Sequence, residues 1–148
     1  MKVVFNDFLS ILIHQTDLSL TSYIKAKLAP LNIAPEQNLI LLLLWKQDGL
    51  TQNEIAKKLE KDKTNVARMI CNLERKGFIT RHINEIDNRS FHVFLTENGK
   101  KLGEIIKPLA EEFNRTVCAG ISDEEQQIVK QVLLKMRQNV EMKCIEPK

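Results

Sequence analysis

The predicted fold is decided by one stretch, residues 50–81, which reads LTQNEIAKKLEKDKTNVARMICNLERKGFITR. Thr51 and Glu54 form the T-x-x-E pattern of a capping box, which predicts that a short helix begins here and covers residues 52–60. After this helix, apolar side chains recur at helical spacing from about residue 63 to residue 76, and Gly77 ends the run. Two helices joined by so short a turn indicate a helix-turn-helix.

A β-hairpin is predicted directly after these two helices. Residues 78–83 (FITRHI) and 90–95 (SFHVFL) are rich in β-forming side chains and alternate loosely between apolar and polar. A hairpin in this place is typical of a winged helix-turn-helix, in which the hairpin is called the wing.

The segments on either side are predicted to be helices. Upstream, apolar residues follow helical spacing over residues 5–28, and a strongly apolar helix is expected over residues 35–46. Downstream, helices are expected over about residues 97–118, with a kink at Pro108, and from a capping box at Ser122 to about residue 142.

The predicted fold class is therefore mainly α with a small β-hairpin wing. A winged helix-turn-helix over residues 33–96 would be flanked by a helical region made of residues 1–32 and 97–148. The apolar stripes of these long terminal helices exceed what one small core needs, so we expect them to form a dimer interface.

Composition excludes several classes of protein. The chain has 148 residues, of which 43% are hydrophobic and 28% charged, as in a globular domain. Its longest apolar run, residues 39–45, is too short to span a membrane, and the N-terminus lacks the pattern of a signal peptide. The cysteines, Cys71, Cys118 and Cys144, suggest neither a disulfide framework nor a metal site, so we expect a cytoplasmic protein.

Motifs for catalysis are missing from the sequence. We find no G-x-S-x-G, Walker loop, H-E-x-x-H or paired cysteine motif, so we expect no enzyme activity and no cofactor. Positive charge is instead concentrated in residues 46–101, which contain 12 Lys and Arg against 8 Asp and Glu. This part of the chain is the one expected to meet a polyanion.

The second helix of the helix-turn-helix has two unlike faces. Val66, Met69, Ile70 and Leu73 fall on one side and should be buried. The outward side carries Thr, Asn and Arg rather than the Glu and Lys of an ordinary solvated face, and Asn and Arg match the edges of adenine and guanine. The residues predicted to contact DNA from this helix are Lys63, Thr64, Asn65, Arg68, Asn72 and Arg75.

The tip of the predicted wing carries a lone arginine, Arg89. Beside a recognition helix in the major groove, a wing tip falls next to the minor groove, whose negative potential attracts an inserted arginine. Asp87 would orient the guanidinium of Arg89 or of Arg81, so all three are predicted DNA-binding residues of the wing. The alternative is a solvated hairpin tip with an incidental ion pair.

Residues 33–102 resemble the winged-helix core of the MarR family of bacterial transcriptional regulators. The resemblance rests on the sequence of residues 50–81, on the D-x-R of Asp87 and Arg89, and on the FLTENGKKL run of residues 94–102. The terminal helices resemble the family's outer segments, although the tip of this wing has an additional acid, Glu85. The resemblance implies an obligate homodimer that binds a palindromic DNA operator and represses transcription until a small ligand or an oxidant relieves it.

Two alternative functions stay open. A winged helix can bind a protein partner instead of DNA, but such a surface would expose apolar or acidic residues. A thiol-responsive regulator is the other, because Cys71 lies on the outward side of the recognition helix, where oxidation would add bulk and charge. A gel shift of Cys71→Ser with and without peroxide tests it. Cys118, near a helix end, is expected to be a small buried residue.

A pocket for a small-molecule effector would most plausibly lie between the winged domain and the dimer helices. Its predicted lining residues are His14, Tyr23 and Trp45, although Trp45 fits the core better. His82 and His92 could face each other across the hairpin, but two histidines do not complete a zinc site, so no metal is expected.

Overall fold

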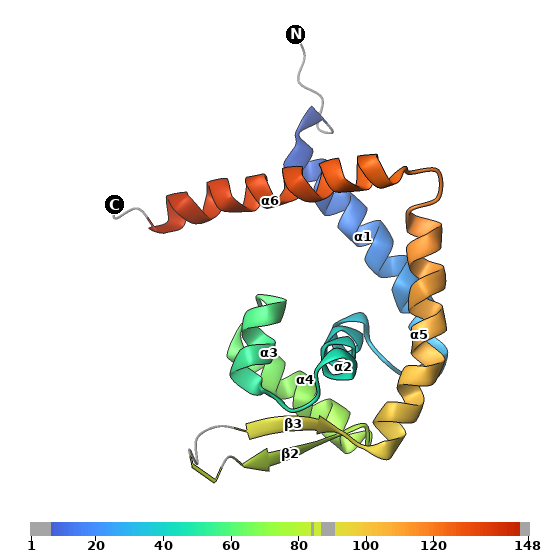
Figure 1. Ribbon diagram of the computed structural model, residues 1–148, viewed down its shortest axis with the longest axis vertical. Coiled ribbons are helices and arrows are strands. Elements are labelled where there is room, and N and C mark those ends of the chain that lie inside the picture. The colour runs from blue at the N-terminus through green and yellow to red at the C-terminus, as the bar shows by residue number, and fades with distance from the viewer. Residues whose placement is uncertain (1–6, 84, 87–90, 146–148) are drawn as a thin grey trace. The chain divides into compact units, whose positions relative to one another are not determined.

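The computed structural model describes residues 7–83, 85–86 and 91–145. Its elements are, in chain order, α1 (Leu9–Leu28), the 3-10 turn η2 (Ala29–Leu31), α2 (Pro35–Lys46), β1 (Leu50–Thr51), α3 (Gln52–Leu59), α4 (Lys63–Arg75), β2 (Ile79–Ile83), β3 (Phe91–Leu95), α5 (Glu97–Val117) and α6 (Asp123–Ile145) (Figure 1). The chain divides into two compact units, residues 1–111 and 112–148, and α5 runs across their boundary. The predicted mainly α class with a small hairpin is confirmed.

The predicted helix boundaries agree closely with the structure because local capping sets them. Thr51 accepts a hydrogen bond from the Glu54 N–H at 3.1 Å, and the Glu54 carboxylate accepts one from the Thr51 N–H at 3.3 Å. Ser122 and Glu125 form the same reciprocal pair at the start of α6, and the hydrogen bond from the Ser122 N–H lowers the pKa of Glu125. Each capping box satisfies backbone donors that a helix start otherwise leaves unpaired.

The first helix begins later than expected. We predicted a helix from residue 5, whereas α1 begins at Leu9, and Phe8 before it offers no side-chain cap. Only residues 7 and 8 of the predicted start belong to the described residues. α5 runs without a break through Pro108, and the kink there stays a prediction.

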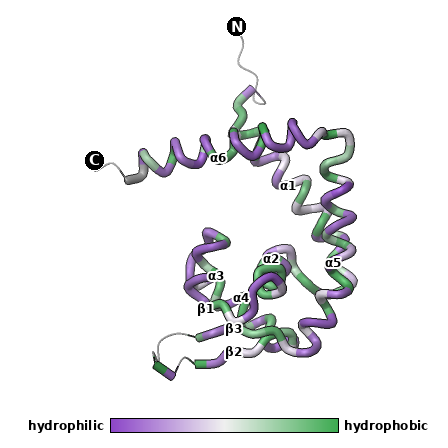
Figure 2. Tube along the Cα trace, viewed as in Figure 1, coloured by the Kyte–Doolittle hydropathy of each residue, from purple (hydrophilic) through white to green (hydrophobic). Residues whose placement is uncertain are grey.

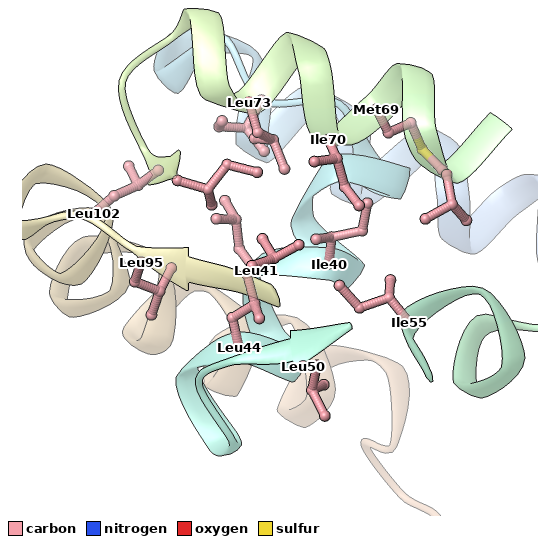
Figure 3. Packing of buried hydrophobic residues seen from close by; sticks show 14 of the residues in the cluster. Ile40, Leu41, Leu44, Leu50, Ile55, Met69, Ile70, Leu73, Leu95 and Leu102 are labelled. Carbon is pink, nitrogen blue, oxygen red and sulfur yellow. The ribbon is translucent and has the colours of Figure 1, made fainter. Parts of the chain in front are cut away.

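A single apolar core holds the winged helix-turn-helix together. Side chains from α2, α3, α4, β2 and β3 meet in it, and the inner face of α4 is almost completely excluded from solvent (Figure 3). The core residues on α4 are Val66, Met69, Ile70 and Leu73, with exposed fractions of 0%, 4%, 0% and 0%. The predicted inward face of this helix is therefore confirmed.

The sheet has one more strand than predicted. β1 pairs with β3, which pairs with β2, all antiparallel, and the hairpin register places His82 opposite His92. β1 contains two residues only, so no alternation of apolar and polar side chains could have revealed it. Asp48, two residues before β1, stabilises the pairing of β1 with β3, because its carboxylate accepts a hydrogen bond from the Leu95 N–H at 2.9 Å.

The hairpin is also joined closely to the start of α5. Thr96 donates a hydrogen bond from its side chain to the Gly77 carbonyl at 2.6 Å and from its backbone N–H to the Phe78 carbonyl at 3.0 Å. Gly99 packs directly on that Phe78 carbonyl, and Gly103 packs on the Trp45 ring. Glycine at these two positions permits a close approach that any side chain would block.

Among the described residues, the outer helices carry apolar side chains that are about half exposed. On α1, the exposed fractions of Leu9, Leu12 and Leu18 are 59%, 48% and 55%. α6 alternates between hydrophobic and hydrophilic residues along its length, and Ile128 and Leu134 are more than half exposed (Figure 2). Within the described part of the chain, none of these helices is long and apolar enough to cross a membrane.

Candidate nucleic-acid interface

The outward face of α4 presents the residues that the sequence predicts to contact DNA. Five of them are exposed and lie on the first two turns and the last turn of the helix, and Asn72 is half-buried. Lys63 and Thr64 occupy the N-terminal turn, where recognition helices meet base edges, and make no side-chain hydrogen bond to any other described residue. The exposed set is Lys63, Thr64, Asn65, Arg68 and Arg75.

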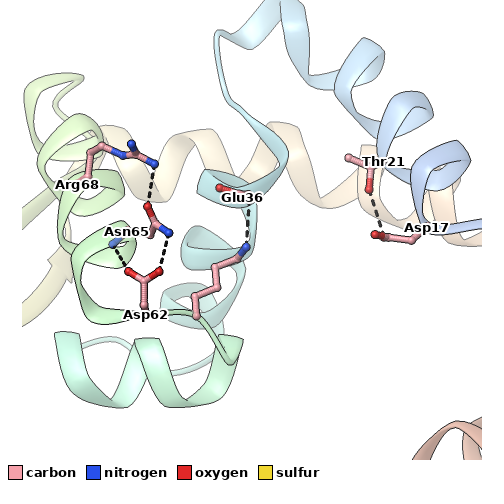
Figure 4. A network of polar contacts seen from close by, with 7 residues as sticks. Asp17, Thr21, Glu36, Asp62, Asn65 and Arg68 are labelled. Atoms are coloured by element: carbon pink, nitrogen blue, oxygen red, sulfur yellow. Dashed lines mark hydrogen bonds and ion pairs between the residues drawn. The ribbon is translucent and has the colours of Figure 1, made fainter. Parts of the chain in front are cut away.

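The start of α4 carries a chain of three hydrogen-bonded side chains. Asp62, the N-cap residue, accepts hydrogen bonds from the Asn65 backbone N–H at 2.8 Å and from the Asn65 amide nitrogen at 2.7 Å. The Asn65 amide oxygen in turn accepts a hydrogen bond from Nη2 of Arg68 at 3.0 Å (Figure 4). Sequence reasoning missed the part played by Asp62, although an aspartate just before a helical run is a recognised N-cap signal.

The same Asn-x-x-Arg spacing recurs farther along the helix. Nη2 of Arg75 donates a hydrogen bond to the Asn72 amide oxygen at 2.8 Å. Among the described residues, no second partner holds the Asn72 amide nitrogen. The two Asn–Arg pairs thus differ in one respect, because only the first is anchored by a carboxylate.

Two contacts fix the helix-turn-helix against α2. Nζ of Lys61, in the turn between α3 and α4, lies 3.0 Å from Oε1 of Glu36 at the start of α2 (Figure 4). At the other end of α4, Lys76 donates hydrogen bonds to the Asn32 carbonyl and to the Gln37 side chain. The recognition helix is therefore held at both ends, and its orientation relative to the core is set.

Arg81 on β2 is held by a side chain of α4. Its guanidinium donates a hydrogen bond to Glu74 at 3.0 Å, and this bond raises the pKa of Arg81 above its ordinary value. The Cys71 side chain adds to that increase, and the guanidinium lies 5.4 Å from the centre of the Phe91 ring. Our suggestion that Asp87 orients Arg81 stays a prediction, because Asp87 lies outside the described residues. The structure adds Glu74, seven residues earlier in sequence than Arg81, as a partner of this guanidinium.

The tip of the wing lies mostly outside the described residues. Asp87 and Arg89, the two predicted DNA-binding residues there, belong to this part, so their contacts stay predictions. Within the paired strands, one position before the pair nearest the tip, His82 and His92 are cross-strand partners as expected. Nδ1 of His92 bonds the Gly49 carbonyl at 2.9 Å and Nε2 of His82 bonds Thr80 at 2.9 Å. One nitrogen of each ring is therefore already engaged.

Comparison with known proteins assigns the family. The family model described as MarR matches residues 33–91. YdgJ of Bacillus subtilis, an uncharacterised HTH-type transcriptional regulator, is 35% identical over 101 residues, which span 68% of this chain and 62% of YdgJ. The structure of the MepR–DNA complex of S. aureus is 32% identical, covers 93% of this chain and 99% of its own, and superposes with a TM-score of 0.83. The structure of a MarR transcriptional regulator from Methanosarcina mazei Go1 is 29% identical, with a TM-score of 0.79. The match covers 92% of this chain and 99% of that one.

The chain belongs to the MarR family. The expectation of a DNA-binding transcriptional regulator that is not an enzyme is confirmed at the level of this family. The chain spans less than two thirds of the length of YdgJ, the first of these relatives.

The effector pocket predicted for this MarR-family chain stays a prediction. His14 and Tyr23 are both exposed on α1, and the ammonium of Lys27 lies 5.5 Å from the centre of the Tyr23 ring. Trp45 is half-buried and donates a hydrogen bond to the Gly99 carbonyl at 3.1 Å, which agrees with its place beside the core. A separate pocket of about 310 Å³ is lined by none of these residues; its walls are Lys25, Ala29, Asn32, Ile33, Ala34, Gln37 and Lys76.

Cys71 and Cys118 of this MarR-family chain are both half-buried. Cys71 belongs to α4, and its side chain contributes to the raised pKa of Arg81 on β2. The thiol-responsive alternative stays a prediction. The expectation that Cys118 is buried is wrong. It lies one residue beyond the end of α5, where its thiol donates a hydrogen bond to the Asn114 amide oxygen at 3.7 Å.

Proposed function

We propose that the protein is a homodimeric repressor that binds a palindromic double-stranded DNA operator, with α4 in the major groove and the wing beside the minor groove. The observation that carries the proposal is the outward face of α4, where exposed Lys, Thr, Asn and Arg side chains follow one another. Its one exposed acid, Asp62, has both carboxylate oxygens occupied by Asn65. MepR, which has the same fold, is bound to DNA in its solved complex.

Residues on α4 and residues on the wing would have different roles in binding DNA. Arg68, on the second turn of α4, would read guanine, because a guanidinium offers parallel donors to O6 and N7 of that base. Lys63 and Arg75, near opposite ends of the helix, would contact phosphates and set the register on the duplex. Arg89 would enter the minor groove, and Arg81 would hold the wing against α4 through Glu74.

Dimerisation is proposed from the uncovered apolar side chains of the outer helices. Leu9, Leu12 and Leu18 on α1, and Ile128 and Leu134 on α6, are each about half exposed in the single chain. Exposed apolar side chains that recur along each of these two helices support the proposal of an interface. We assign residues 1–32 and 97–148 to dimerisation and residues 33–96 to DNA binding. A small-molecule effector, of unknown identity, would bind near His14, Tyr23 and Trp45.

The experiment that tests this function is a binding titration of the purified protein with a randomised DNA pool and with its own upstream DNA. We expect nanomolar binding of a palindrome by one dimer, with an affinity that falls steeply as salt rises, because each neutralised phosphate releases counterions. Light scattering would give the mass of the free protein. Weak binding that is blind to sequence, or a monomer on the operator, would contradict the proposal.

Arg68→Ala should weaken operator binding by about 1–3 kcal/mol and relax base choice at one position of each half-site. Arg89→Ala is the contrasting variant, since it should weaken binding to all sequences and lower the salt dependence by about one counterion. Fluorescence anisotropy with wild-type and single-base-changed operators measures both effects. If both variants bind every operator as the wild type does, the proposed docking is wrong.

A further inference from the structure

The hydrogen bonds at the start of α4 determine which way the Asn65 amide is turned. An ionised carboxylate can only accept hydrogen bonds, so the Asn65 atom that lies 2.7 Å from Oδ2 of Asp62 must be the amide nitrogen. The amide oxygen therefore lies on the other side, where a guanidinium, which can only donate, approaches to 3.0 Å. The Asp62 carboxylate, the Asn65 amide and the Arg68 guanidinium therefore fit together in one orientation of the amide only (Figure 4).

This arrangement engages the two atoms of Asn65 that a base contact needs. A bidentate contact with adenine requires the amide oxygen and the amide nitrogen to point at the same base edge. Here the oxygen is directed at Arg68 and the nitrogen at Asp62. By contrast, Arg68 uses one N–H group in this chain, and its other N–H groups have no partner among the described residues. The group left to read DNA is the guanidinium.

We propose that Asn65, anchored by Asp62, is a positioning residue that sets the guanidinium of Arg68 for a bidentate contact with guanine, and that Asn65 does not itself read a base. This inference rests on the proposed function, since it specifies how the recognition helix reads its operator. Arginine has many rotamers, and fixing one of them before binding removes part of the ordering cost that binding would otherwise include. When the bound guanine excludes water, the hydrogen bonds that link Asp62, Asn65 and Arg68 strengthen one another.

The second Asn–Arg pair of the same helix provides a matched control. Arg75 bonds Asn72 at 2.8 Å, but no carboxylate turns the Asn72 amide in the way that Asp62 turns Asn65. Asn72→Ala therefore removes a similar hydrogen bond from the same face of α4. It leaves the hydrogen bonds among Asp62, Asn65 and Arg68 in place. It should leave the reading of guanine by Arg68 unchanged.

The test compares operators in which single guanines or adenines are replaced by their 7-deaza analogues, which lack the N7 acceptor. Wild-type affinity should fall about tenfold at the guanine that Arg68 reads, which is the loss of one arm of a bidentate contact. Asn65→Ala should bind the normal operator about fivefold more weakly, and its penalty for that 7-deazaguanine should fall to about twofold. Asn72→Ala should keep the full penalty.

Two further variants separate positioning from a general structural effect. Asp62→Ser keeps a helix cap but has no second oxygen for the Asn65 amide, so it should behave like Asn65→Ala in the deaza test. Asn65→Ala keeps the backbone N–H that Asp62 caps, and its melting temperature should equal that of the wild type. In a double-mutant cycle, Asn65→Ala combined with Arg68→Ala should bind as weakly as Arg68→Ala alone.

Several outcomes would overturn the inference, and they can be told apart. If Asn65→Ala keeps the 7-deazaguanine penalty but loses a penalty for 7-deazaadenine, Asn65 reads adenine directly. If the effects of Asn65→Ala and Arg68→Ala multiply, the two residues act independently. If the wild-type protein selects no sequence at all, the proposed function fails as well, and the inference with it.

Discussion

Gly99→Ala should lower the free energy of unfolding by about 3 kcal/mol, although helix propensity alone predicts the opposite sign. Alanine is favoured over glycine inside a helix by about 1 kcal/mol. At Gly99, however, an added Cβ would lie 2.1 Å from the carbonyl oxygen of Phe78, a distance at which backbone must move. That carbonyl already accepts a hydrogen bond from the Thr96 N–H at 3.0 Å, so it has little room to shift.

Urea denaturation followed by circular dichroism measures this change, and Asn98→Ala is the matched control. Asn98 is the exposed neighbour of Gly99 on α5, and its replacement should alter stability by no more than about 0.5 kcal/mol. A Gly99→Ala protein as stable as the wild type, or more stable, would mean that the start of α5 can move away from the hairpin. The close contact would then not fix the angle between the wing and α5.

Ile70→Ala should lower the free energy of unfolding by about 4 kcal/mol, because it opens a cavity at the centre of the core. Ile70 is completely excluded from solvent on the inner face of α4, where it packs among residues of α2 and α3 (Figure 3). Ile70→Val removes a smaller group and should lower stability by only about 1 kcal/mol. The measurement is again urea denaturation, with the exposed Thr64→Ala on the outer face as control.

A loss below about 1 kcal/mol for Ile70→Ala would contradict this packing, since it would require the core to collapse around the missing atoms. The expected loss is a large share of the stability of a small domain, so the variant should also be partly unfolded at 37 °C. Loss of operator binding by Ile70→Ala would then report unfolding and would say nothing about base contacts. For that reason none of the DNA-binding variants proposed above changes a residue of the apolar core.

The helices and their boundaries could be predicted because their signals are local. The buried side of α4 follows from a 3.6-residue period, and the start of α3 follows from the Thr51–Glu54 capping box. The pairing of His82 with His92 could be predicted from the hairpin alone. Each of these features involves residues a few positions apart, or a register that a single turn determines.

Features that depend on side-chain rotamers or on contacts distant in sequence could not be predicted in this way. Asn65 and Arg68 were correctly expected on the outward face, but their hydrogen bond depends on which way each side chain turns. The ion pair of Arg81 with Glu74 joins β2 to the preceding helix, and no local pattern in the sequence indicates it. β1 was missed because backbone pairing with β3, rather than any pattern in its own two residues, makes it a strand.

The link between β1 and the wing has a consequence for building chimeras of related regulators. Asp48 bonds the Leu95 N–H at 2.9 Å, Gly49 donates from its N–H to the Val93 carbonyl at 3.0 Å, and its own carbonyl bonds His92. A graft that carried only the hairpin would leave these partners behind, and an isolated two-stranded hairpin is marginally stable. A graft of the wing therefore has to include Asp48 and Gly49 as well as the hairpin.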